Sequence, residues 1–225
     1  MSTRALEAAT PLRLRTRSEG HRQWRLHVLA RSPLVLLGIV LVVFFVSVAA
    51  LADELAPADP VAMNAASALQ APSLAAPFGT DRFGRDVLSR AMFGTRASLF
   101  VGVGSIVVAA TVGTIIGLVS GFFGGALDNL LGRVMDVFFT FPSLILAIAI
   151  SAALGLGIQN ALLAIAVTYW PVFGRLVRGA TMAERSKDYV QAAWVVGASG
   201  GRIMRDHILP NCLSPIVVQV TVAIS

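Results

Sequence analysis

Long apolar stretches without charge recur along this chain, and their lengths predict helices that cross a lipid bilayer. The first stretch runs from residue 33 to 51 and is close to the roughly 20 residues that one crossing needs. The second, from residue 97 to 127, is long enough for one tilted helix and its ends. We therefore predict two membrane-spanning helices in the first half of the chain.

The second half stays uncharged from residue 137 to 174, which is longer than one crossing requires. Glycine and amide turn residues, GLGIQN at 155–160, lie near its middle and predict two helices, at about 138–154 and 160–177. A last apolar run from residue 215 to 225 is too short for a crossing. The fold class expected is all-α: a multi-pass integral membrane protein with four complete transmembrane helices plus the start of a fifth.

Composition supports lipid as the solvent of these helices. Hydrophobic residues make up 56% of the chain and charged residues only 13%, against roughly 45–50% and 25% in soluble domains. The first apolar run is too long for the core of a secretion signal, which has about 7–15 residues, so we interpret it as a retained helix. The net charge of +6 is scattered between the apolar runs, which argues against nucleic acid as a partner.

Loop charge predicts the orientation, because loops on the cytoplasmic side are enriched in Lys and Arg. Seven arginines precede the first run, whereas the loop between the first two runs holds four arginines and five acidic residues. We therefore expect a cytoplasmic tail at 1–32 and a membrane domain at 33–225, with an outer loop at 52–96 and a cytoplasmic segment at 178–210. The four helices in between satisfy the even number of crossings that this requires.

The sequence lacks the motifs of the common catalytic and metal sites. No phosphate-binding G-x-x-x-x-G-K-[ST] loop occurs, and the single lysine, Lys187, has no glycines around it. Cys212 is the only cysteine, and none of the three histidines has a carboxylate or thiolate neighbour at metal-ligand spacing. We expect no cofactor, no metal and no enzyme activity in this chain alone.

The most informative segment is DYVQAAWVVGASGGRIMRDHILPN at 188–211, between two apolar runs. Gly197 can end a short helix, the glycines at 200–201 allow a second change of direction, and Pro210 suits the start of the next helix. The expected result is a short helix held across the membrane surface. Its packing face, at spacings of three or four, would hold Tyr189, Ala192, Ala193 and Val196.

This segment resembles the EAA loop of permeases of binding-protein-dependent ABC importers, with QAA in place of EAA. The resemblance implies a coupling helix that docks in a cleft of a cytoplasmic ATP-binding subunit and passes its movement to the membrane helices. The Gln in place of Glu keeps the hydrogen-bonding capacity and loses the carboxylate. The coupling residues so implied are Tyr189, Gln191, Ala192, Ala193, Gly197, Arg202, His207, Leu209 and Pro210.

Two further segments resemble the dipeptide/oligopeptide branch of the same family. In FGTDRFGRDVLSRAMFGTRASL at 78–99, Asp81, Arg82, Arg85, Asp86 and Arg90 can pair locally, or Arg85 and Asp86 can orient a partner. In GFFGGALDNLLGRVMDVFFTFPSLILAIA at 121–149, Asp128 lies between two spans, and Arg133 and Asp136 can pair on one helix face. These charges have either a structural role at the inner boundary or a role in gating or ATPase contact. Prolines within the spans, Pro142 and Pro171, are expected to kink their helices.

The resemblance is closest to the second permease of the dipeptide/oligopeptide systems. It implies a homologous second permease, cytoplasmic ATP-binding subunits and an extracytoplasmic solute-binding protein as partners, in the bacterial inner membrane. Peptides are the expected cargo, and nickel, glutathione and antimicrobial peptides are the alternatives that this permease type shares. Family members have six helices, so we expect this chain to be either a fragment or the product of a truncated gene.

Two rival classes are disfavoured by the residues present. A secondary transporter driven by an ion gradient would need intramembrane ionisable residues or broken helices in paired repeats. A membrane enzyme or scaffold would need a catalytic constellation or a large surface outside the membrane. Uptake that fails on ATP depletion with the ion gradient held constant separates the importer from the first rival.

Overall fold

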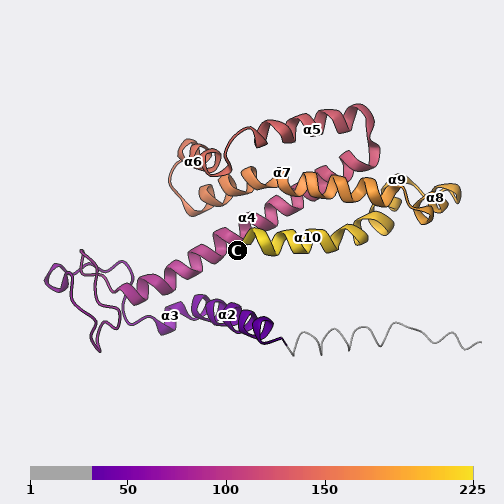
Figure 1. The fold of residues 1–225 in the computed structure, drawn as a ribbon. Helices are drawn as coiled ribbons and strands as arrows, with labels where there is room; N and C mark the ends of the chain where they lie inside the picture. The colour runs from indigo at the N-terminus through magenta and orange to yellow at the C-terminus, as the bar shows by residue number, and fades with distance from the viewer. Residues whose placement is uncertain (1–31, 225) are drawn as a thin grey trace, which may run out of the picture.

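The computed structural model describes residues 32–224, and in this part of the chain helices are joined by loops without a β-strand (Figure 1). The predicted basic tail, 1–32, lies outside the described residues except for Ser32. The elements are α2 (Pro33–Ala50), α3 (Ala52–Leu55), the 3₁₀ turn η1 (Ala65–Ser67), α4 (Val87–Phe123), α5 (Gly125–Phe139), α6 (Ser143–Leu154), α7 (Ile158–Arg185), α8 (Asp188–Val195), α9 (Gly200–Ile203), the π-helical turn η2 (Met204–Ile208) and α10 (Leu209–Ile224).

Several of these helices are long and apolar enough to cross a membrane. Among the described residues they are α2, α4, α7 and the helix at Gly200–Ile224 that α9, η2 and α10 form together. The expectation of an all-α, multi-pass membrane protein is confirmed. With 37 residues, α4 is about 55 Å long, so it extends well beyond a hydrocarbon core of about 30 Å.

The α4 helix packs against α7 along a line of small residues. Gly113, Gly117 and Gly121 lie one turn apart on α4, and each faces the backbone of α7. A methyl group added at Gly117 would lie 2.4 Å from the carbonyl oxygen of Gly174. Small residues at this spacing allow helix backbones to approach closely in membranes. Around this contact, α7 and α10 lie alongside α4 (Figure 1).

The third predicted span, 138–154, differs from the structure. Two helices occupy this region, α5 and α6, and they meet at 89° across a break at residues 140–142. Pro142 lacks the N–H that would continue α5, and it becomes the residue before the first turn of α6 instead. The expectation that Pro142 bends its helix is therefore confirmed, but the bend divides the chain into two helices.

The turn predicted at 155–160 is present and is shorter. α6 ends at Leu154, and the side-chain amide of Asn160 donates hydrogen bonds to the carbonyls of Leu154 and Gly155, at 2.8 and 3.1 Å. Gly155 has φ 87°, a left-handed conformation that glycine adopts without steric cost. The following helix, α7, starts at Ile158 and continues to Arg185, eight residues past its predicted end at 177.

The last helix starts earlier than its apolar run predicted. Helical structure is continuous from Gly200 to Ile224, and the π-helical turn η2 ends at Ile208, two residues before Pro210. A proline inside a helix removes one hydrogen bond and its ring crowds the preceding turn. The wider π-helical turn accommodates both effects. Pro210 is thus the second residue of α10, near its start as predicted, and η2 continues the helix in front of it.

Candidate functional site

The helix α8 connects the end of α7 to the C-terminal helix. It ends as the sequence predicts: Gly197 has φ 83°, and its N–H donates to the carbonyl of Trp194. The N–H of Ala198 donates to the carbonyl of Ala193 at 3.0 Å. These two bonds form a Schellman motif, which requires a left-handed residue at the position that Gly197 occupies.

The packing face of α8 differs from the predicted one. Val190 is fully buried and Ala193 is 8% exposed, so these two residues face the protein. Val195 and Val196 are 87% and 81% exposed, and Ala192 is exposed beside them. The predicted set therefore divides between two faces, with Ala193 packed inside and Ala192 and Val196 outside. We call Ala192, Val195 and Val196 the exposed tip of α8.

The buried side of α8 belongs to a hydrophobic cluster that draws on α4, α7 and the C-terminal helix. The indole ring of Trp194 stacks on the ring of Phe122 at the end of α4, with centroids 5.8 Å apart and an interplanar angle of 17°. α8 is thus fixed to the ends of three long helices. The buried members are Phe122, Val177, Val190, Ala193, Ile203, Ile208, Cys212 and Ile216.

A polar cluster around Tyr189 makes a second attachment. The phenol hydroxyl donates to Glu184 Oε2 on α7 at 2.6 Å, and it accepts from the side-chain amide of Asn211 on α10 at 3.1 Å. The same amide donates to the carbonyl of His207 at 2.7 Å. The hydrogen bond to the Glu184 carboxylate, with burial second, raises the pKa of Tyr189 to about 12, so the hydroxyl stays protonated and keeps donating.

The remaining predicted coupling residues are only partly brought together. The ring of His207 lies 6.4 Å from that of Tyr189, centroid to centroid. Gln191 is exposed and donates to the carbonyl of Arg185 at 3.2 Å, so it continues the attachment to α7. Arg202 and Pro210 are exposed and take no part in the Tyr189 cluster, and Leu209 is half-buried.

A buried ion pair lies next to α8 and was missed by the sequence interpretation. Asp128 on α5 is 8% exposed and receives hydrogen bonds from Arg178 of α7, where Nη2 lies 2.6 Å from Oδ2, and from the hydroxyl of Ser120 on α4. Three helices thus meet at one carboxylate. A cavity of about 340 Å³ beside it is lined by Asp128, Arg185, Gln191 and four neighbours.

The predicted pairing of Arg133 with Asp136 is wrong. Asp136 pairs with Arg175 on α7, whose guanidinium also lies over the ring of Phe139 at 4.1 Å. Both acids of α5 therefore pair with arginines of α7. Charges in apolar segments are almost always paired, so two acids and two arginines in such segments were a signal for these pairs.

Local pairing in the segment 78–99 is confirmed for Asp81. Its carboxylate accepts from Arg85, with Nη2 at 2.8 Å from Oδ2, and from Arg90. Burial alone would raise the pKa of Asp81, but the hydrogen bonds from Arg85 and Phe83 outweigh it and lower the pKa. Asp86 pairs with none of the arginines that the structure describes: it caps α4 by accepting from the backbone N–H of Ser89 at 2.7 Å. The guanidinium of Arg82 lies 4.9 Å from the centroid of the Phe83 ring.

Comparison with known proteins agrees with this architecture. Residues 113–225 match the family described as the inner membrane component of binding-protein-dependent transport systems. The dipeptide transport system permease protein DppC of Alkalihalophilus pseudofirmus is 42% identical over 193 residues, which cover 86% of this chain and 64% of that protein. DppC of Haemophilus influenzae is 40% identical, over 84% of this chain and 66% of its own length.

A relative with a different named solute is also similar. The glutathione transport system permease protein GsiD of Pectobacterium atrosepticum is 42% identical over 149 residues, covering 66% of this chain and 50% of that protein. This chain thus spans about two thirds or less of the length of the curated relatives it matches. The matched residues include α8 and the last helix, and the chain belongs to the family of inner membrane components of binding-protein-dependent transport systems.

Proposed function

We propose that this chain is a transmembrane permease subunit of an ATP-driven importer for di- and oligopeptides. It would form half of the translocation pathway beside a homologous second permease. A separate cytoplasmic ATP-binding subunit would supply the energy, and an extracytoplasmic solute-binding protein would deliver the cargo. The names of the dipeptide relatives support a peptide cargo. The glutathione relative supports the same chemical class, because glutathione is itself a tripeptide.

The observation that carries the coupling role is the structure of α8. Its exposed tip presents small and apolar side chains to the outside, and its other side is fixed to three long helices. An exposed apolar surface on a helix whose other side is packed into the protein suits insertion into a cleft on another protein. A displacement of the tip would be transmitted to α7 and α10 by the hydrogen bonds of Tyr189. It would be transmitted to α4 by the stacking of Trp194 on Phe122.

The proposed orientation places α8 and the N-terminal tail in the cytoplasm and the loop 52–86 on the outer side. The basic residues beside α8 support this, because Lys187, Arg185 and Arg202 lie at the ends of apolar helices. The even number of crossings between tail and α8 is preserved if α5 and α6 together make one crossing.

The test is purification of the native membrane complex through a tagged chain, with its partners identified by mass spectrometry. The wild type should bring an ATP-binding subunit and a second permease, and Val195→Asp should lose the ATP-binding subunit while keeping the second permease. Leu156→Asp is the matched control, because Leu156 is also an exposed apolar residue and lies in the distant α6–α7 turn. Val195→Asp is preferable to a change at Ala193, which packs inside the chain. Retention of the ATP-binding subunit by Val195→Asp would refute the docking role.

A further inference from the structure

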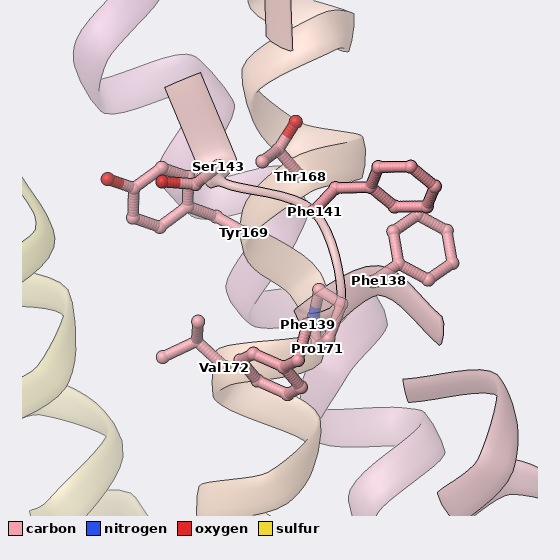
Figure 2. Close-up of a pocket in the computed structure, with 8 residues that line it drawn as sticks. All are labelled: Phe138, Phe139, Phe141, Ser143, Thr168, Tyr169, Pro171 and Val172. Atoms are coloured by element: carbon pink, nitrogen blue, oxygen red, sulfur yellow. The ribbon is translucent and has the colours of Figure 1, made fainter. Parts of the chain in front are cut away.

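A pocket opens where the break between α5 and α6 meets the middle of α7 (Figure 2). Its volume is about 230 Å³. Phenylalanine rings line one part of it, and Ser143 and Tyr169 contribute hydroxyl groups to the lining (Figure 2). Neither hydroxyl makes a hydrogen bond with another described residue. The lining residues are Phe138, Phe139, Phe141, Ser143, Thr168, Tyr169, Pro171 and Val172.

Two interruptions of backbone hydrogen bonding meet at this pocket. In the α5–α6 break, the carbonyls of Thr140 and Phe141 accept no hydrogen bond from the described residues. On the opposite wall, Pro171 has no N–H and so leaves the carbonyl of Val167 without its usual helical donor. Such carbonyls need water or another polar group as a partner.

The pocket lies deep in the membrane-spanning part of α7. Its residues at 168–172 follow the first residue of α7 by 10 to 14 positions, which is about 15–21 Å along the helix axis. That depth is near the middle of a hydrocarbon core of about 30 Å. Irregular backbone at this depth is tolerated only where it is buried in protein or lines a water-filled cavity. The pocket therefore does not face lipid.

We propose that this pocket lies on the water-filled translocation pathway and receives an apolar or aromatic side chain of the peptide in transit. The phenylalanine rings supply the apolar contact for such a side chain. The free hydroxyls of Ser143 and Tyr169, with the open carbonyls of the break, can bond the peptide backbone or its water. The inference rests on the proposed function, since it requires a peptide cargo.

The test uses cysteine labelling in the assembled complex. Cys212 is the only cysteine and is fully buried, so Cys212→Ala provides a cysteine-free background in which Ser143→Cys reports on the pocket. Leu144→Cys is the matched control: it is the next residue on α6, is 72% exposed, and does not line the pocket. A charged, membrane-impermeant methanethiosulfonate should modify Ser143→Cys and leave Leu144→Cys unmodified. The dipeptide Phe-Phe should slow the modification about tenfold more than Gly-Gly does.

Each other outcome overturns the proposal. Modification of Ser143→Cys only by a lipid-soluble maleimide would place the pocket against lipid. No modification by either reagent would mean that another helix covers it. Modification that neither dipeptide slows, in a complex that still takes up labelled dipeptide with ATP, would refute the peptide site alone. Absence of ATP-driven dipeptide uptake by the wild-type complex would refute the proposed function, and the peptide site with it.

A second variant tests the size of the pocket independently of labelling. Tyr169→Ala removes a ring from the wall, so it should reduce the preference for Phe-Phe over Gly-Gly in ATP-driven uptake by about tenfold. Co-purification of the second permease and the ATP-binding subunit with Tyr169→Ala shows that the variant assembles. An unchanged preference in an assembled complex would contradict the assignment.

Discussion

Asp128 shows how a single side chain can tie together helices that are distant in sequence. Its carboxylate receives Arg178 from α7 and Ser120 from α4, and it is almost fully buried. Removing one partner of a buried, hydrogen-bonded ion pair leaves the other charge without compensation. The free-energy cost of removing one partner of this ion pair is therefore larger than the net stabilisation that the intact pair provides.

We predict that Asp128→Asn lowers the thermal stability of the complex in detergent. The loss should be about 1–3 kcal/mol, because Arg178 is left with a weaker partner but keeps some contact with water. Asp53→Asn is the control, since Asp53 is 66% exposed in the short helix α3 and its ion pair with Arg96 is of the surface kind, so its loss should be below about 1 kcal/mol. Equal losses in the two variants would contradict the special position of Asp128.

Tyr189 gives a prediction about pH. Its pKa in the folded chain, about 12, lies above the ordinary value of about 10, so its hydrogen bond stabilises the α7–α8 junction below pH about 10. That contribution is lost as the pH rises from about 10 to about 12.

The measurement is an absorbance titration of tyrosinate formation. The chain has two tyrosines, so the difference between the wild type and Tyr189→Phe isolates Tyr189. We expect the midpoint of the Tyr189 titration near pH 12. A midpoint near pH 10 would show that the hydrogen bond from Tyr189 to Glu184 is not formed in solution.

At the scale of the helices, the close contact of α4 with α7 depends on glycine at defined positions. A methyl group at Gly117 would lie 2.9 Å from the N of Arg178 as well as 2.4 Å from the carbonyl oxygen of Gly174, both of them backbone atoms. We predict that Gly117→Ala separates the helices and costs about 1–3 kcal/mol, measured as reduced thermal stability of the complex. Gly102→Ala on the same helix, which meets nothing within 4 Å, should be neutral or slightly stabilising. A neutral Gly117→Ala would refute the close packing.

Much of this element structure could be predicted from sequence. Uncharged runs gave the approximate positions of α2, α4 and α7, and Gly197 gave the end of α8, because length, charge and turn residues act locally. The packing face of α8 could not be predicted, since both of its faces carry small or apolar residues. Packing in a cluster with residues distant in sequence, among them Phe122 and Val177, selects Val190 and Ala193 for burial.

The break between α5 and α6 and the ion pairs of α5 were missed for a related reason. An apolar run does not reveal where a helix turns by 89°, and Pro142 alone is compatible with a kink or a break. Arg133 and Asp136 have the spacing of a helical pair, yet Asp136 pairs across helices with Arg175 because the packing of α5 on α7 brings the two together. Tertiary packing therefore overrode a correct local rule.

At the scale of the whole molecule, the proposed topology makes a prediction of its own. Reporter domains fused before residue 33 and at Lys187 should report the same, cytoplasmic side, because an even number of crossings separates them. A reporter placed at residue 156, in the α6–α7 turn, should report the outer side. If the reporter at Lys187 is active outside the cell, α8 lies on the outer side of the membrane and cannot dock on a cytoplasmic ATP-binding subunit.

The most direct test of the central claim is the uptake of labelled dipeptide by proteoliposomes that contain the complex purified from native membranes. The account predicts uptake that requires ATP hydrolysis, persists without an ion gradient, is lost in Val195→Asp and is kept in Leu156→Asp. Uptake driven by an ion gradient in the absence of ATP, or undiminished ATP-driven uptake by Val195→Asp, would contradict it.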